Sequence, residues 1–235
     1  MPKHASSQET GLILVRARSS PITIVVTIVV LTIMMVLTMG LATRAQALEF
    51  SDIAQEGQLR FLAVHPDPSA YRYESRVRIT RDSLESGVVS LTTCHYQLDP
   101  IRKIVIVYNP KRLQNLEIAS ATRIGGLEVQ GHRVTMTDVQ RGATICIDLE
   151  SKALDRIDST TYRLMAGPLM RRYFDGYLPM HARLMFEWPA HLLELKQTNP
   201  SPQPGVRLMQ DSSTAELDIT FAGKLVANID LSLPQ

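Results

Sequence analysis

The sequence has little of what marks an enzyme, a cofactor-binding protein or a nucleic-acid-binding protein. It contains no H-E-x-x-H zinc motif, no G-x-S-x-G elbow and no G-x-G-x-x-G that follows a strand and opens a helix. Its 25 basic residues nearly balance its 23 acidic residues, which argues against a basic surface for nucleic acid. We therefore expect no cofactor, no metal ion and no nucleic-acid partner.

The sequence also has little amphipathic helical pattern after residue 47. Short runs rich in Val, Ile, Thr and aromatic residues follow one another there, separated by Gly, Pro and Asn at intervals of about 8–12 residues. In residues 71–79, tyrosine and aliphatic side chains alternate with charged ones, as in a half-buried strand. Parallel strands need crossover helices, for which this chain has no room. We therefore predict an all-β, antiparallel β-sandwich-like domain.

The predicted strands are short and form one domain over 48–235, and a division into two would fall near 155–161. A short helical turn is expected within 148–158. Hairpin turns are expected at Gly131-His132 and at 222–224, where the second joins the last two strands. The runs that fit a strand are 71–79, 87–96, 101–108, 116–120, 127–130, 134–136, 143–149, 161–166, 181–188, 192–198, 206–210, 215–221 and 225–233.

One long apolar run precedes this β-rich part. Residues 21–42 contain no charged residue, and a helix of that length spans roughly 30 Å, the thickness of a bilayer core. Basic residues come before the run, and the small-x-small sequence from Ala45 to Ala47 follows it, as in a secretory signal peptide. We expect the hydrophobic helix in 1–47 to be either a signal peptide cleaved after Ala47 or a retained signal anchor.

These two outcomes imply two locations. Cleavage gives a periplasmic or secreted protein, whereas retention gives a single-pass inner-membrane protein whose C-terminal domain lies outside the cytoplasm. In the second case the membrane is itself a partner, through the N-terminal segment.

The sequence has only two cysteines, Cys94 and Cys146. In an oxidising compartment such a pair most simply forms a disulfide. The alternative is a reactive thiol beside His95, but neighbours along a strand point to opposite faces. The only tryptophan, Trp188, lies outside the interval between the cysteines, so the Cys-Trp-Cys order of immunoglobulin domains is absent. The sequence thus predicts a sandwich of no specific superfamily.

Residues 167–180 are rich in arginine, methionine and aromatic residues and are bounded by Gly and Pro. We expect a loop here, with a helical turn at 169–174. This composition is enriched at protein interfaces. The alternative is that the loop folds over the open end of the sandwich and its aromatic side chains belong to the core. The candidate ligand- or partner-binding residues are Arg171, Arg172, Tyr173, Asp175, Tyr177 and His181.

Histidines and carboxylates near the same segment are the best available metal ligands. However, His181 and Glu187 lie six residues apart on one strand face, roughly 20 Å, which is too far for one ion. Ordinary surface residues are therefore the favoured interpretation. The residues considered are His181, His191, Glu187, Glu194 and Asp175.

Three functions fit these observations. The leading hypothesis is an exported, envelope-associated, non-enzymatic binding or interaction module that uses the segment around Arg171 to Tyr177 to engage an envelope protein. The alternative is a periplasmic hydrolase or metal-dependent enzyme that acts on envelope material through His181, His191 and nearby carboxylates. A purely structural role in an envelope complex is the third.

Overall fold

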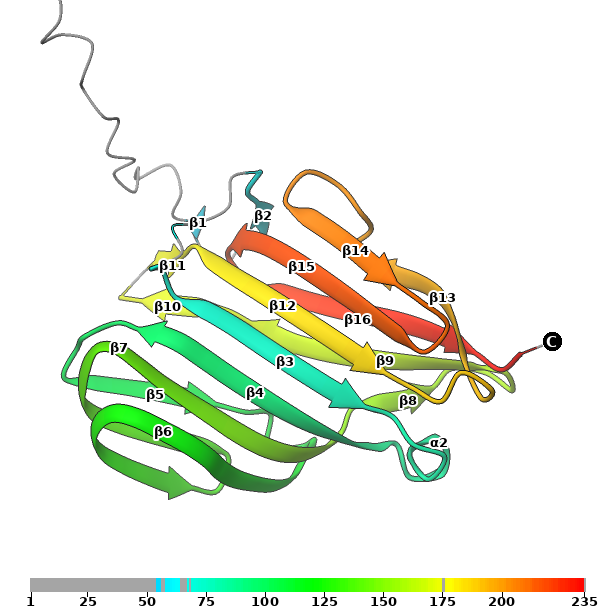
Figure 1. The fold of residues 1–235 in the computed structure, drawn as a ribbon, viewed down its shortest axis with the longest axis horizontal. Helices are drawn as coiled ribbons and strands as arrows, with labels where there is room; N and C mark the ends of the chain where they lie inside the picture. The colour runs from blue at the N-terminus through cyan, green and yellow to red at the C-terminus, as the bar shows by residue number, and fades with distance from the viewer. Residues whose placement is uncertain (1–53, 56–57, 64–66, 68, 175, 235) are drawn as a thin grey trace, which may run out of the picture. The chain divides into compact units, whose positions relative to one another are not determined.

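The computed structural model describes residues 54–55, 58–63, 67, 69–174 and 176–234 (Figure 1). The hydrophobic helix expected within 1–47 and Asp175 lie outside these residues. Within the described ranges, no helix is long and apolar enough to cross a membrane.

The described chain is mostly β-strand and has almost no helix, which confirms the all-β prediction. Its only helix in that part is one short turn, α2 (Ser83–Ser86), which ends at Gly87 in the left-handed conformation. The strands are β1 (Ala54–Gln55), β2 (Arg60–Phe61), β3 (Arg72–Arg78), β4 (Val88–Leu98), β5 (Lys103–Val107), β6 (Leu113–Gln130), β7 (Arg133–Lys152), β8 (Leu154–Arg156), β9 (Thr161–Leu169), β10 (Arg171–Tyr173), β11 (Gly176–Leu178), β12 (Met180–Glu187), β13 (Glu194–Asn199), β14 (Val206–Gln210), β15 (Thr214–Ala222) and β16 (Leu225–Ser232).

Two sheets pack face to face and form the sandwich-like core. The larger has nine strands along the path β14-β15-β12-β3-β4-β7-β5, with β2 beside β15 and β6 beside β7, and the smaller has the order β13-β16-β9-β8. Along β12 the side chains of Ala182, Leu184 and Phe186 point inward and are buried, as the alternating pattern predicts. They pack in one cluster with the inward residues of β15 and β16.

A second core lies under a curled part of the larger sheet. The long strands β6 and β7 form a hairpin that bends as a unit, and Figure 1 shows them curving together. Strand β6 pairs with one edge of β7, and both β4 and β5 pair with the other edge. They occupy successive parts of that edge. The buried residues of this core are Leu98, Val134, Met136, Val139, Ala143, Ile145, Ile147 and Leu149.

The bend occurs at the same level in three strands. Gln97 in β4, Arg123 in β6 and Asp138 in β7 all have a positive φ, as does Gly142 at 75°. A Cβ on Gly142 would lie 3.2 Å from Arg123 Nη1 and 3.5 Å from Gln97 Oε1. The pairing registers shift here too. Bulges of this kind bend a strand and increase its twist, which explains how one sheet encloses two cores.

The structure corrects several local predictions. The short runs at 116–120 and 127–130 belong to the single strand β6, and those at 134–136 and 143–149 belong to β7, although the Gly131-His132 hairpin turn is confirmed. The helical turn expected within 148–158 is wrong, because β7 continues to Lys152 and β8 follows.

Two pairings also differ from expectation. Strands β3 and β12 pair in parallel, and the connection between them is made of strands β4 to β11 instead of a helix. Strands β15 and β16 do not form a hairpin, since β15 pairs in the larger sheet and β16 in the smaller one. The link at 222–224 therefore crosses from one layer to the other.

Candidate interaction surface at the hairpin end

The segment predicted as a loop contains a small β-hairpin. Strands β10 and β11 pair antiparallel, with Arg171 opposite Leu178 and Tyr173 opposite Gly176. Strand β1 adds to the other edge of β11 through Ala54 opposite Tyr177. The loop prediction is wrong because β1, far away in the sequence, satisfies the backbone hydrogen bonds that a short isolated hairpin leaves open. We call β1, β10 and β11 the hairpin end.

Arg171 is part of the scaffold of this end. Its Nη2 donates to Asp99 Oδ2 at 2.6 Å and its Nη1 donates to the carbonyl of Pro179 at 3.2 Å. Its guanidinium also lies 5.1 Å from the ring centroid of Tyr71. These contacts join the hairpin to the link between β4 and β5, so Arg171 holds the hairpin end in place.

Beneath this contact lies a buried aromatic cluster. The hydroxyl of Tyr71 lies 2.8 Å from His95 Nδ1, and the ring of Tyr73 meets the His95 ring edge-on at 5.1 Å. Burial lowers the pKa of the His95 imidazole to about 4, because the charged form loses its hydration. Burial raises the pKa of the Tyr71 hydroxyl above its usual range. His95 is therefore a neutral core residue, and it points to the face opposite Cys94.

The tip of the hairpin is open to solvent. The side chain of Phe174 is 80% exposed and that of Tyr173 is 46% exposed, and their rings meet edge to face at 4.6 Å. Arg172 is exposed beside them, and its Nε donates to the Phe174 carbonyl at 3.3 Å. Tyr177 is half-buried. Arg172, Tyr173 and Phe174 thus lie on the surface and outside the core, while Arg171 is held by Asp99 and the Pro179 carbonyl.

Sequence reasoning missed Phe174, Asp99 and Tyr71 at this end. Phe174 lies inside the predicted segment, and the Asp175-Gly176 dipeptide after it is a common hairpin-turn signal. That signal could have indicated a turn beside Phe174, although it played no part in the prediction above. No local pattern marks Asp99 as the partner of Arg171, because the two are 72 residues apart.

The two arginines are expected to differ in their effect on folding. Arg171→Ala should lower the free energy of unfolding by about 1–2 kcal/mol, since it removes charged hydrogen bonds that are only partly screened by solvent. Arg172→Ala should change it by less than about 0.5 kcal/mol, because the side chain is exposed. Urea unfolding of both variants measures this, and equal losses would show that Arg171 is not the scaffold residue.

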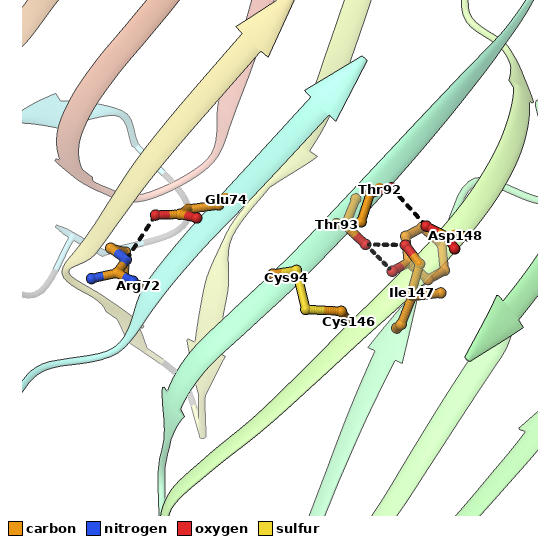
Figure 2. Close-up of a disulfide and its surroundings, with 9 residues drawn as sticks. Arg72, Glu74, Thr92, Thr93, Cys94, Cys146, Ile147 and Asp148 are labelled. Atoms are coloured by element: carbon orange, nitrogen blue, oxygen red, sulfur yellow. Dashed lines mark hydrogen bonds and ion pairs between the residues drawn. A yellow bond between two sulfur atoms is a disulfide. The ribbon is translucent and has the colours of Figure 1, made fainter. Parts of the chain in front are cut away.

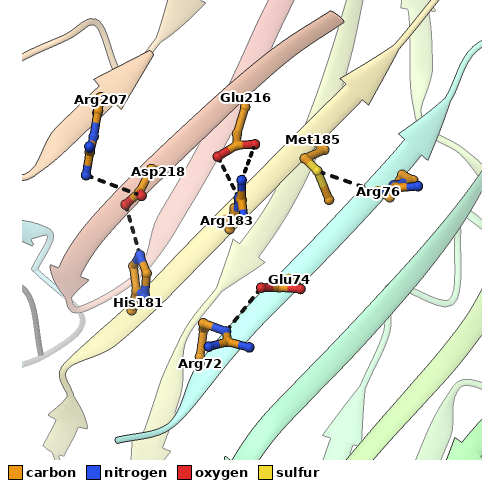
Figure 3. Close-up of polar contacts among 9 residues, drawn as sticks. All are labelled: Arg72, Glu74, Arg76, His181, Arg183, Met185, Arg207, Glu216 and Asp218. Carbon is orange, nitrogen blue, oxygen red and sulfur yellow. Dashed lines mark hydrogen bonds and ion pairs between the residues drawn. The ribbon is translucent and has the colours of Figure 1, made fainter. Parts of the chain in front are cut away.

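His181 belongs to a row of polar and charged side chains on the outer face of the larger sheet (Figure 3). Its Nε2 lies 2.9 Å from Asp218 Oδ1 on β15. The next outward residue of β12, Arg183, pairs with Glu216 through two hydrogen bonds of 2.6 and 2.9 Å. His181 thus lies on β12 beside β15 and outside strands β10 and β11 of the hairpin.

The proposed metal ligands are not brought together. His181 lies near the start of β12 and Glu187 at its end, where the Glu187 carboxylate pairs with Arg76 and Arg78. His191 is exposed in the turn that follows β12. Among the described residues, no group of three or more His, Cys, Asp or Glu side chains is placed to hold a metal ion.

The cysteine pair lies on the outer face between β4 and β7 (Figure 2). Cys94 is directly opposite Cys146 in the register of these strands, with their sulfur atoms 2.10 Å apart, at disulfide distance. Thr92 donates to Asp148 at 2.6 Å close by. The geometry therefore agrees with the predicted pairing of the two cysteines.

Comparison with known proteins identifies no family. No family model matches the sequence, and no curated protein matches it. A substrate-bound mutant of an M1 zinc metallopeptidase from Deinococcus radiodurans aligns at 11% identity with a TM-score of 0.37, covering 76% of this chain and 43% of that one. A two-domain M1 zinc metallopeptidase bound to L-tryptophan aligns at 12% identity with a TM-score of 0.35, covering 77% and 44%. This chain spans less than half of those proteins, and scores this low carry no argument about its fold or function.

Proposed function

We propose that this chain is an exported, envelope-associated protein that works by binding and not by catalysis, and that it binds through the hairpin end. The single observation that carries the proposal is the exposed tip, where Phe174 and Tyr173 stand in solvent beside Arg172. A water-exposed phenylalanine costs solvation free energy, and exposed aromatic clusters mark interaction sites. The apolar run at 21–42 supports export.

The contacts at the base of the tip support the same proposal. Arg171 fixes the hairpin to Asp99 and to the Pro179 carbonyl, and β1 covers the other edge of β11. A tip held by such contacts loses little conformational entropy when it binds, so its aromatic side chains contribute more to affinity. The location follows the same alternatives as before: periplasmic or secreted after cleavage at Ala47, or anchored in the inner membrane.

Site-specific photocrosslinking in intact cells tests the binding surface. A photoreactive phenylalanine analogue at position 174 should give a covalent adduct. The same analogue at Ile157 is the matched control, because Ile157 is also an exposed apolar residue but adjoins the first residues of β9, away from the hairpin end. Equal adduct yields at the two positions would overturn the proposed surface.

The hydrolase or metal-enzyme hypothesis has a separate test. Metal analysis of the purified full-length chain, together with ester and glycan hydrolysis assays, would support it if metal bound in stoichiometric amount and His181→Ala abolished turnover.

A further inference from the structure

Several of the exposed apolar side chains of the described chain lie in the hairpin end or in the segments next to it. Besides Phe174 and Tyr173, these are Met170, Leu59 and Val226. The pairing registers place them at one end of the sandwich. Leu169, just before Met170, is opposite Leu225, just before Val226, and the backbone at Gly223 closely approaches Leu59. Exposed apolar residues that share one end of a domain indicate a surface that is covered in use.

Basic residues accompany these apolar side chains. Arg172 lies in the hairpin, and Lys224 is exposed in the link between β15 and β16, next to Leu225. Two acidic residues are described near this end: Asp99, which is paired with Arg171, and the exposed Asp67, which accepts hydrogen bonds from Ser69. Asp175 in the turn lies outside the described residues. Basic side chains around an apolar tip complement the negative surface of a phospholipid bilayer.

The chain enters the domain at this same end. The first described strand, β1, begins at Ala54 and pairs with Tyr177 and Gly176 of the hairpin. Ala54 follows the last residue of the uncharged run, at position 42, by twelve residues. A chain of that length reaches at most about 40 Å when extended. A membrane anchor at 21–42 would therefore limit the distance between β1 and the end of that anchor to about 40 Å.

We propose that the occupant of the hairpin end is a lipid bilayer surface, with Phe174 and Tyr173 in its interfacial layer. This inference rests on the proposed binding function and names the partner. The tip offers few side chains, whereas a stable protein interface usually needs about 800 Å² from each partner. Insertion of a few aromatic side chains roughly 5–10 Å deep, with cations at the headgroups, is the arrangement found in interfacial membrane proteins.

Tryptophan fluorescence in vesicles tests this contact. The native Trp188 is buried and follows the last residue of β12, whereas the hairpin comes before the first residue of β12. The emission of Trp188 should therefore form a constant background. The full-length Phe174→Trp variant is reconstituted in anionic phospholipid vesicles whose acyl chains carry bromine. The emission of the added tryptophan should fall roughly twofold or more relative to unbrominated vesicles, as expected for a side chain at interfacial depth.

The full-length Ile157→Trp variant is the control, and its added emission should stay nearly constant. Both substitutions replace exposed apolar residues, and urea unfolding checks that each variant folds as the native chain does. Equal quenching in the two variants, or none at position 174, would overturn the lipid proposal. A crosslinked protein adduct at position 174 without quenching would leave the binding function standing and reject the lipid, whereas neither signal would reject both.

Discussion

Replacing both cysteines, as Cys94→Ala with Cys146→Ala, should lower the free energy of unfolding by about 4 kcal/mol. The two residues are 52 apart in sequence, and the chain-entropy model assigns this value to a cross-link that closes a loop of that length. The cross-link also joins β4 to β7 where the sandwich meets the curled sheet. Urea unfolding of the variant and of the native chain under oxidising conditions measures the loss.

A reducing agent provides the matched control. It should destabilise the native chain by a similar amount and leave the double variant unchanged, because the variant has no bond to reduce. Thiol counting under denaturing, non-reducing conditions gives an independent check. Two free thiols in the native protein would contradict the disulfide.

Acidification from pH 7 to pH 5 should cost about 2 kcal/mol of stability through His95. Its folded pKa of about 4 lies below the ordinary value of 6.5, so the unfolded chain binds a proton that the folded chain rejects. The contribution of His95 to the free energy of unfolding is fully present above pH 6.5. It is lost as the pH falls towards 4, at up to about 1.4 kcal/mol per pH unit. Urea unfolding at the two pH values measures the difference.

The variant His95→Gln should remove most of this pH dependence, whatever its stability at pH 7, because glutamine does not titrate. His191→Gln is the matched control, since His191 is exposed, and it should keep the native dependence. Aspartates whose pKa is lowered by hydrogen bonds, such as Asp158 and Asp230, have an ordinary pKa of 3.8, so they contribute mainly below pH 5. An unchanged acid loss in His95→Gln would contradict the assignment.

The features that sequence patterns predicted well are local. In β12 the buried residues alternate with outward-facing ones because successive side chains of any strand point to opposite faces. The same rule separated Cys94 from His95, and in the structure they point to opposite faces of β4. The hairpin turn at Gly131-His132 was likewise found from two adjacent residues.

The features that sequence patterns missed depend on distant partners. The segment 167–180 reads as a loop because β10 and β11 are three residues each, too short to show a period. Only pairing with β1 makes them part of a sheet. In the same way, the link at 222–224 has the length of a hairpin turn, yet packing places β15 and β16 in different layers.

The candidate site also combines features that are local in sequence with features that depend on distant partners. The sequence identified the segment by its arginine and aromatic residues, but it treated Arg171 and Arg172 as equivalent. The structure distinguishes them. Arg171 donates to Asp99, which is 72 residues away in the sequence, whereas Arg172 is exposed to solvent. Phe174, the most exposed aromatic residue of the tip, was recognised only from its exposure in the structure.

By itself, the sequence determined that the described part of the chain after residue 47 is all-β, which side chains of β3 and β12 point inward, and which cysteines can pair. These follow from short-range geometry, in which each residue depends on its neighbours along the strand. The tertiary structure alone decided the strand partners, the bend that makes two cores, and the exposure of the hairpin tip. These depend on which sheet edges and faces meet across long sequence distances, where many pairings satisfy the same local pattern.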